Sequence, residues 1–178
     1  MRSLLMVLAV WAIAASLSSP SDAQPTPEQL TVRPGDKIIW TDTTMGHVVI
    51  FGGLPALKPL ADVQKVLTFD PPLSVDGPAG VSPQGGNPML TATVKADALA
   101  SGVTGFNFGC AVHPGSMISR AFTIAPSNGQ PPREHKIRAR SNPNNWELET
   151  AAGGVVIDAM LASPPNSVAA NQPAGHRH

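Results

Sequence analysis

The sequence contains no tyrosine, and its five phenylalanines and three tryptophans are its only large aromatic residues. Aliphatic side chains must therefore fill most of the core. Only one cysteine is present, Cys110, which excludes a disulfide bond within the chain. Acidic and basic residues balance at 12 each, so the formal net charge is zero. Because no positive charge is in excess, we expect neither nucleic acid nor an anionic membrane as a partner.

Proline and glycine are abundant by contrast, with 19 and 16 of the 178 residues. Both residues favour turns and weaken helices, so we expect many turns and little helix. The chain length suits one domain with a modest core. These features together predict a β-rich domain with irregular connections.

The first 23 residues have the pattern of a secretory signal peptide. Arg2 supplies a positive charge, the apolar run Leu4–Leu17 follows, and Ser21-Asp22-Ala23 offers small residues for cleavage after Ala23. The run is shorter than the about 20 residues that span a bilayer. We therefore expect a periplasmic or otherwise exported protein with no stable membrane insertion after processing. An uncleaved anchor is the alternative.

One stretch near the middle of the chain, residues 106–117, concentrates metal-binding side chains. It contains Cys110, His113 and Met117 with the spacing Cys-x2-His-x3-Met. Thiolate and thioether groups favour Cu(I), and imidazole suits both oxidation states of copper. A lone cysteine with these neighbours indicates a metal ligand rather than an inert buried thiol.

A second imidazole is available at His47, at the start of an apolar run that predicts a strand over 47–51. Two histidines, a cysteine and a weak axial methionine form the ligand set of blue-copper sites. With these residues the chain resembles the cupredoxins, the family of plastocyanin, pseudoazurin and amicyanin. The resemblance extends over roughly Leu30–Ile124.

The resemblance implies an all-β fold, a Greek-key β-sandwich with a short helix. It also implies one type 1 copper ion per chain as cofactor. The expected function is electron transfer between redox proteins, such as exported cytochromes or oxidoreductases, by a monomer that is not an enzyme. The implied metal ligands are His47, Cys110, His113 and Met117.

Two other classes of function stay open at this point. The protein could be a periplasmic copper carrier or storage protein that delivers the ion rather than electrons. It could also be an interaction domain that keeps the fold without metal. Met45, two residues before His47, is the nearest rival to Met117 for the axial position.

The remaining pattern predicts short elements joined by loops. The turn Pro34-Gly35-Asp36 precedes a strand over Lys37–Trp40. Apolar residues at helical spacing predict a short helix within Pro59–Phe69, and 74–88 is expected to be loop. Further strands are expected at Met89–Lys95, Val103–Phe108 and Met117–Ile124.

The C-terminal part, 126–178, is poor in apolar residues and is expected to be a largely disordered, low-complexity tail after a copper-binding domain over 24–125. The basic run Arg133–Arg140 is interpreted as a solvated stretch. A short apolar segment predicts a hairpin at 146–160. In the family an N-terminal strand protects one edge of the sheet, but here Gln24–Gln29 is short and holds two prolines. Only the segment 146–160 could cover that edge instead.

Two positions beside the ligands also depart from the family pattern. Relatives commonly place Asn after the first histidine and Ser or Thr after the cysteine, and these side chains bridge the two ligand loops. This chain has Val48 and Ala111 there. Support for the ligands must then come from the backbone, and we expect the amides of Val48 and Val112 to donate to the thiolate.

Overall fold

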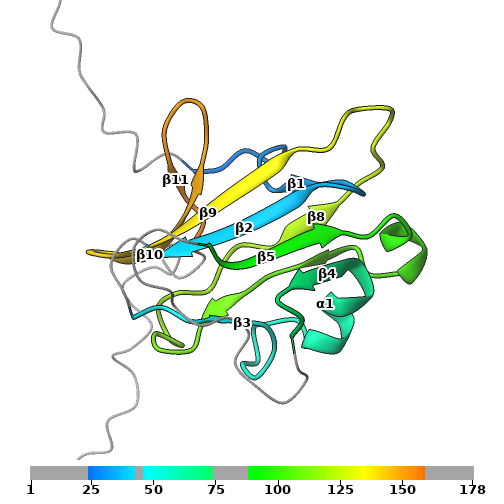
Figure 1. Cartoon of the computed structure of the whole chain (residues 1–178). Coiled ribbons are helices and arrows are strands. Elements are labelled where there is room, and N and C mark those ends of the chain that lie inside the picture. The colour runs from blue at the N-terminus through cyan, green and yellow to red at the C-terminus, as the bar shows by residue number, and fades with distance from the viewer. Residues whose placement is uncertain (1–23, 43–45, 74–87, 159–178) are drawn as a thin grey trace, which may run out of the picture.

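The computed structural model describes residues 24–42, 46–73 and 88–158 (Figure 1). The expected signal peptide at 1–23, the rival ligand Met45, nearly all of the expected loop at 74–88 and the last residues of the expected hairpin lie outside the described residues. No helix in the described part of the chain has the length and apolar character needed to cross a membrane.

Strands dominate the described residues, and they form three sheets. The largest sheet has six strands, β11 (Val155–Val156), β10 (Asn144–Glu149), β9 (Glu134–Ser141), β2 (Lys37–Asp42), β5 (Pro88–Val94) and β4 (Leu67–Asp70), in that order (Figure 1). A second sheet has the order β1 (Thr31–Val32), β8 (Phe122–Ile124) and β6 (Gly105–Phe106). The third consists of β3 (Val49–Ile50) and β7 (Gly109–Cys110).

Most neighbouring strands are antiparallel, but two pairs are parallel: β2 with β9, and β1 with β8. One short α-helix, α1 (Leu60–Val66), and one 3-10 helix, η2 (Ala98–Ser101), complete the described elements. The expectation of an all-β fold with a short helix is confirmed at this level.

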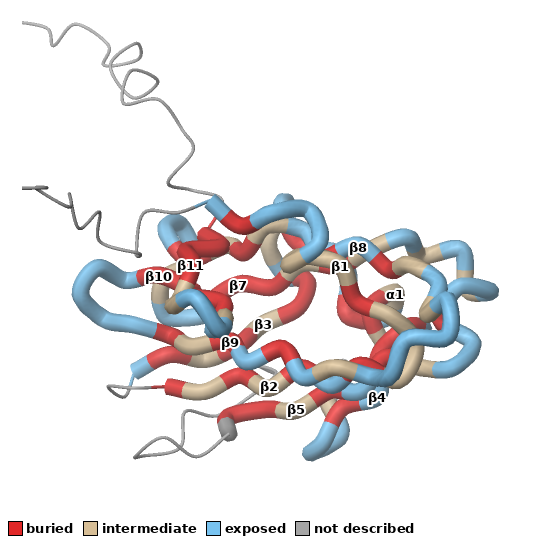
Figure 2. Tube along the Cα trace, turned by 90° about the horizontal axis from the view of Figure 1, so that it is seen from above, coloured by how far each residue is buried: buried red, intermediate tan, exposed pale blue. Residues whose placement is uncertain are grey.

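The six-stranded sheet packs its inner face against the two smaller sheets. Figure 2 shows β2, β5 and β9 on one side and β7, β1 and β8 on the other, with buried residues between them. Phe108, fully buried, joins these layers. Its ring lies 5.3 Å from that of Trp40 on β2, 5.2 Å from that of Trp146 on β10 and 6.1 Å from that of Phe122 on β8. The aromatic residues in the described part of the chain are therefore concentrated at the centre of the core.

The predicted helix begins where the proline indicates but ends early. Pro59 occupies the N-cap position, with the φ of −54° that its ring imposes. Leu67 is already extended and starts β4, in which Leu67 and Phe69 are buried and alternate with exposed residues. Pairing of β4 with β5 thus overrides the helical pattern after Val66.

The expectation of a largely disordered tail is wrong for residues 126–158. The basic run forms β9, in which His135, Ile137 and Ala139 are buried while the charged residues between them lie outside the core. A strand with one solvated face needs an apolar residue only at every second position, so a segment with few apolar residues can still be a strand. The expected hairpin is present in part, since β10 pairs antiparallel with β11, and β10 also pairs with β9.

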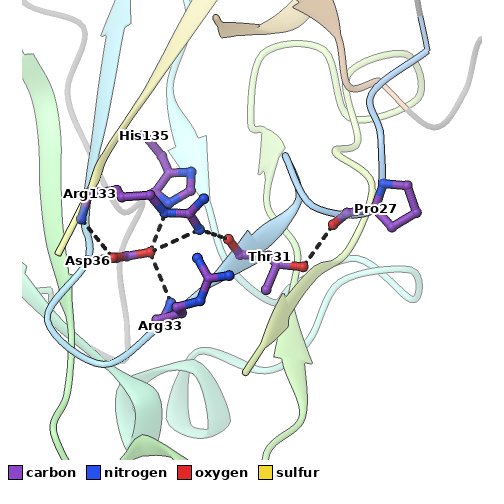
Figure 3. Close-up of polar contacts among 6 residues, drawn as sticks. All are labelled: Pro27, Thr31, Arg33, Asp36, Arg133 and His135. Carbon is purple, nitrogen blue, oxygen red and sulfur yellow. Dashed lines mark hydrogen bonds and ion pairs between the residues drawn. The ribbon is translucent and has the colours of Figure 1, made fainter. Parts of the chain in front are cut away.

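A buried polar junction joins the start of β2 to the start of β9 (Figure 3). One carboxylate oxygen of Asp36 accepts the backbone N–H of Arg133 at 2.8 Å. The other accepts the backbone N–H of Arg33 and the Nε2–H of His135, both at 3.0 Å. The Arg133 guanidinium lies 3.5 Å from Asp36 and donates to the Thr31 carbonyl of β1. One carboxylate therefore ties together three strands.

The junction is most stable at neutral and higher pH. Burial lowers the pKa of His135 below 6.5 in spite of the neighbouring carboxylate, so the neutral ring donates the bond. Burial alone would raise the pKa of Asp36, but the hydrogen bonds from Arg133, His135 and Arg33 outweigh it and bring the pKa below 3.8. Both groups bind protons more readily in the unfolded chain than in the folded protein. The free energy of unfolding therefore falls as the pH drops below 6.5, through His135, and falls further below pH 3.8, through Asp36.

We predict that Asp36→Ala lowers the free energy of unfolding by about 3 kcal/mol, because it leaves several buried donors without an acceptor. Urea denaturation at pH 7 measures the change. Asp62→Ala is the control, since that carboxylate is exposed and forms its ion pair with Lys65 on the same helical turn. Similar midpoints for Asp36→Ala and the parent would contradict a stabilising role for the junction.

Candidate metal centre

Strand pairing brings the two halves of the site together. β3 follows His47 and pairs antiparallel with β7, which ends at Cys110, so that Val49 lies opposite Cys110. His113 and Met117 lie in the loop that follows β7. The His113 carbonyl accepts the N–H groups of Ser116 and Met117, at 3.2 and 3.1 Å, and the Cys110 N–H donates to the Met117 carbonyl at 3.0 Å. These backbone bonds close the loop on itself.

Three of the predicted ligands converge in the structure. The Sγ of Cys110 lies 3.7 Å from Nδ1 of His47 and 3.6 Å from Nδ1 of His113. One donor atom from each of the three residues falls within 4.8 Å of the others. His47 and Cys110 are fully buried, whereas His113 is partly exposed. The group therefore lies close enough to bind one metal ion, with one ligand at the surface.

The spacing of the donors is compatible with one shared metal ion. Donors bound at about 2.3 Å for sulfur and about 2.0 Å for nitrogen, at a tetrahedral or slightly wider angle, lie about 3.5–3.7 Å apart. Both sulfur–nitrogen distances, 3.7 and 3.6 Å, agree with this separation. In each histidine the same ring nitrogen, Nδ1, faces the sulfur. The donor set thus fits a soft or borderline metal.

Met117, the fourth predicted ligand, is fully buried and lies near the other three. Its position follows from the loop, because its own N–H and carbonyl both bond to backbone groups of predicted ligand residues. The methionine beside one cysteine and two histidines completes the residue types of a blue-copper set.

The surroundings of His47 keep its ring neutral. Burial lowers the pKa of His47 below 6.5; the carboxylate of Asp42 opposes this effect, and the neighbouring His113 adds to it. A neutral imidazole has a free lone pair for a metal ion. Asp42, itself buried, also accepts the backbone N–H of His47 at 3.2 Å and so fixes the chain at this residue.

The expected backbone support between the two ligand loops is present. The Ala111 N–H donates to the Val48 carbonyl at 2.9 Å, which joins the two positions at which relatives use side chains. The expected amide bonds to sulfur are not seen: among the described residues, the polar contacts of Sγ are the two ring nitrogens rather than the amides of Val48 and Val112. The side chain of Val112 is exposed.

Sequence reasoning missed two residues that contact the site from the C-terminal strands. The Ser141 Oγ lies 3.0 Å from Nε2 of His47, and the Trp146 Nε1–H donates to the Met117 carbonyl at 3.3 Å. The alternation in 134–141 is a signal for β9, and Trp146 already lies within the expected hairpin. No local signal relates Ser141 or Trp146 to a ligand, because only sheet pairing brings them there.

Comparison with protein-family models, curated proteins and solved structures finds no match to this chain.

We predict that Ala111→Pro weakens metal binding by about 10–100-fold, the usual effect of losing support around a ligand. Proline removes the N–H that joins Ala111 to Val48. Competition with a chromophoric chelator gives the affinity. Ala111→Ser keeps the amide and should bind as the parent does, so equal weakening in both variants would contradict a role for the backbone bond.

Proposed function

We propose that this chain is a type 1 copper protein of the cupredoxin kind that carries single electrons between redox partners. The observation that supports this most is the convergence of the Cys110 sulfur and two imidazoles at 3.6 and 3.7 Å, with a buried methionine beside them. His47, Cys110, His113 and Met117 would hold the ion. Copper in such a set supplies a one-electron couple between Cu(II) and Cu(I).

The fold restricts movement of the ligands, which suits electron transfer. His47 is fixed at its backbone by Asp42, and Cys110 is fixed by the Met117 carbonyl. Three of the four side chains are fully buried. Close packing of this kind leaves little room for rearrangement. A ligand set that moves little can serve both oxidation states of a metal with small reorganisation.

His113 is the ligand through which we propose that electrons reach the surface. It is partly exposed, and its neighbours Val112, Pro114 and Gly115 are exposed and uncharged. Val112 is 55% exposed, one of the two large hydrophobic residues most exposed in the described part of the chain. A small apolar surface suits short-lived docking to partners such as exported cytochromes, since transient redox complexes bury little area.

Two further features of the chain support this function. The two-layer packing of the sheets is consistent with a Greek-key sandwich. The pattern of the first 23 residues supports export to the periplasm or an equivalent compartment. In this proposal the protein acts as a monomer and has no substrate of its own.

We predict that the copper-loaded protein is intensely coloured through charge transfer from the Cys110 thiolate. Cys110→Ser should abolish this visible absorption, because an alcohol does not supply the thiolate. Absorption spectra of both proteins at equal copper content test the proposal. Ser119→Ala, which changes a hydroxyl near the same loop, should keep the colour. An unchanged spectrum in Cys110→Ser would place the metal elsewhere and overturn the proposal.

We further predict fast electron exchange without loss of the ion. Stopped-flow mixing with a small exported cytochrome should oxidise or reduce the protein quickly, while a Cu(I) acceptor should remove copper only slowly. The buried positions of His47, Cys110 and Met117 are the reason, since the ion cannot leave without opening the core. The reverse result, slow electron exchange with rapid transfer of copper, would indicate a copper carrier.

A further inference from the structure

Ser141 contacts a ring atom of His47 that the metal group does not use. His47 has two ring nitrogens: Nδ1 lies 3.7 Å from the sulfur of Cys110, and Nε2 lies 3.0 Å from the Ser141 Oγ. The ring is fully buried, so Nε2 is shielded from bulk water. The hydroxyl of Ser141, the last residue of β9, therefore contacts the ring of His47 at the nitrogen that does not face the sulfur.

The chemistry of a metal ligand defines the direction of this bond. A ring that offers the Nδ1 lone pair to a metal carries its proton on Nε2. Nε2–H then donates to the Ser141 Oγ, and this bond selects the tautomer and sets the angle of the ring. The hydroxyl also increases the electron donation of the imidazole by accepting a hydrogen bond from Nε2–H.

Strand register explains why Ser141 reaches this place. β9 runs parallel to β2, and Asp42 at the end of β2 pairs with Ala139. Ser141 thus lies two residues beyond the end of β2, on the side toward which the chain continues to His47. The backbone of His47 is held by Asp42 in the same region. Pairing of β9 with β2 consequently positions both the acceptor for the backbone and the acceptor for the ring.

Trp146 of β10 makes a second contact, with the other half of the site. It is fully buried, and its Nε1–H donates to the Met117 carbonyl, which also accepts the N–H of Cys110. Its ring lies 5.2 Å from that of Phe108 and 6.4 Å from that of His47. The indole thus holds the loop that carries the cysteine and the methionine.

We propose that the C-terminal hairpin β9–β10 is part of the metal centre, with Ser141 positioning the ring of His47 and Trp146 positioning the ligand loop. This inference rests on the proposed copper site and extends it to residues beyond the expected copper-binding domain. Neither residue is a metal ligand. Each acts through a ligand or through the backbone beside one.

The experiment compares full-length variants with the parent. Ser141→Ala should weaken copper binding about 10–100-fold, in line with the loss of outer support for a metal-bound histidine. It should also raise the reduction potential, since the ring donates less to Cu(II). In NMR spectra of the Cu(I) form, the slowly exchanging Nε2–H proton of His47 should be lost. Ser141→Thr keeps the hydroxyl and should restore all three properties.

The control for the serine is Thr93→Ala. Thr93 is an exposed hydroxyl residue on β5, level with Lys37 at the opposite end of β2, and its loss should change none of the three properties. If Ser141→Ala matches the parent and Thr93→Ala in affinity, potential and proton exchange, the positioning role of Ser141 is overturned. If the parent itself shows no thiolate–copper absorption, the proposed function fails, and this inference fails with it.

The control for the tryptophan is Trp40→Phe. Both residues are fully buried beside Phe108, but the indole N–H of Trp40 has no hydrogen-bond partner among the described residues. Trp146→Phe should increase the rate of copper loss to a chelator by about tenfold or more. Trp40→Phe should not, although it removes the same atoms from the core. Equal rates in the two variants would overturn the role assigned to Trp146.

Discussion

Parallel pairing of β9 with β2 is the interaction on which the rest of the structure depends. β2 lies inside the six-stranded sheet, with β5 on one edge and β9 on the other. Without β9, its N–H and C=O groups would form an exposed edge. A parallel neighbour requires a crossover connection, and here the connection contains β3 and β7, β6 and β8 of the two smaller sheets, and the metal-binding loop. The C-terminal strands therefore come after the ligand residues in the chain and lie against them.

The register of this pair is defined at both ends by polar contacts. At one end the Asp36 carboxylate accepts the backbone N–H of Arg133, just before β9 begins, and the backbone N–H of Lys37 donates to the Arg133 carbonyl at 2.9 Å. At the other end Ser141 meets the ring of His47. A shift of one residue in the register of β9 would turn the side chains of Ile137 and Ala139 out of the core and place charged side chains inside it. Stability of the sheet and geometry of the site thus have a common cause.

The distribution of burial within the site connects this architecture to the proposed chemistry. The Cys110 sulfur and the His47 imidazole are buried and shielded from water, and the His113 imidazole lies at the surface among uncharged residues. The chain has equal numbers of acidic and basic residues, and its net charge of zero adds no long-range attraction to partners. Recognition would then depend on the shape and apolar character of the surface around His113.

Local patterns in the sequence determined a large part of the fold and the donor types of the metal group. The strand at Lys37, the turn before it, the start of α1 at Pro59 and the strand at Met89 follow from turn residues and periodicity, which act between near neighbours. The donor types of the metal group could also be recognised, because Cys110, His113 and Met117 lie within eight residues.

Tertiary structure alone decided the rest. Pairing between distant segments ended the helix at Val66 and made a strand of the charged run before Ser141. It also placed Ser141 and Trp146 beside ligands about 30 to 95 residues away along the chain. Hydrogen bonding between strands depends on backbone groups that every residue possesses, so the sequence near Ser141 carries no mark of the histidine that it contacts.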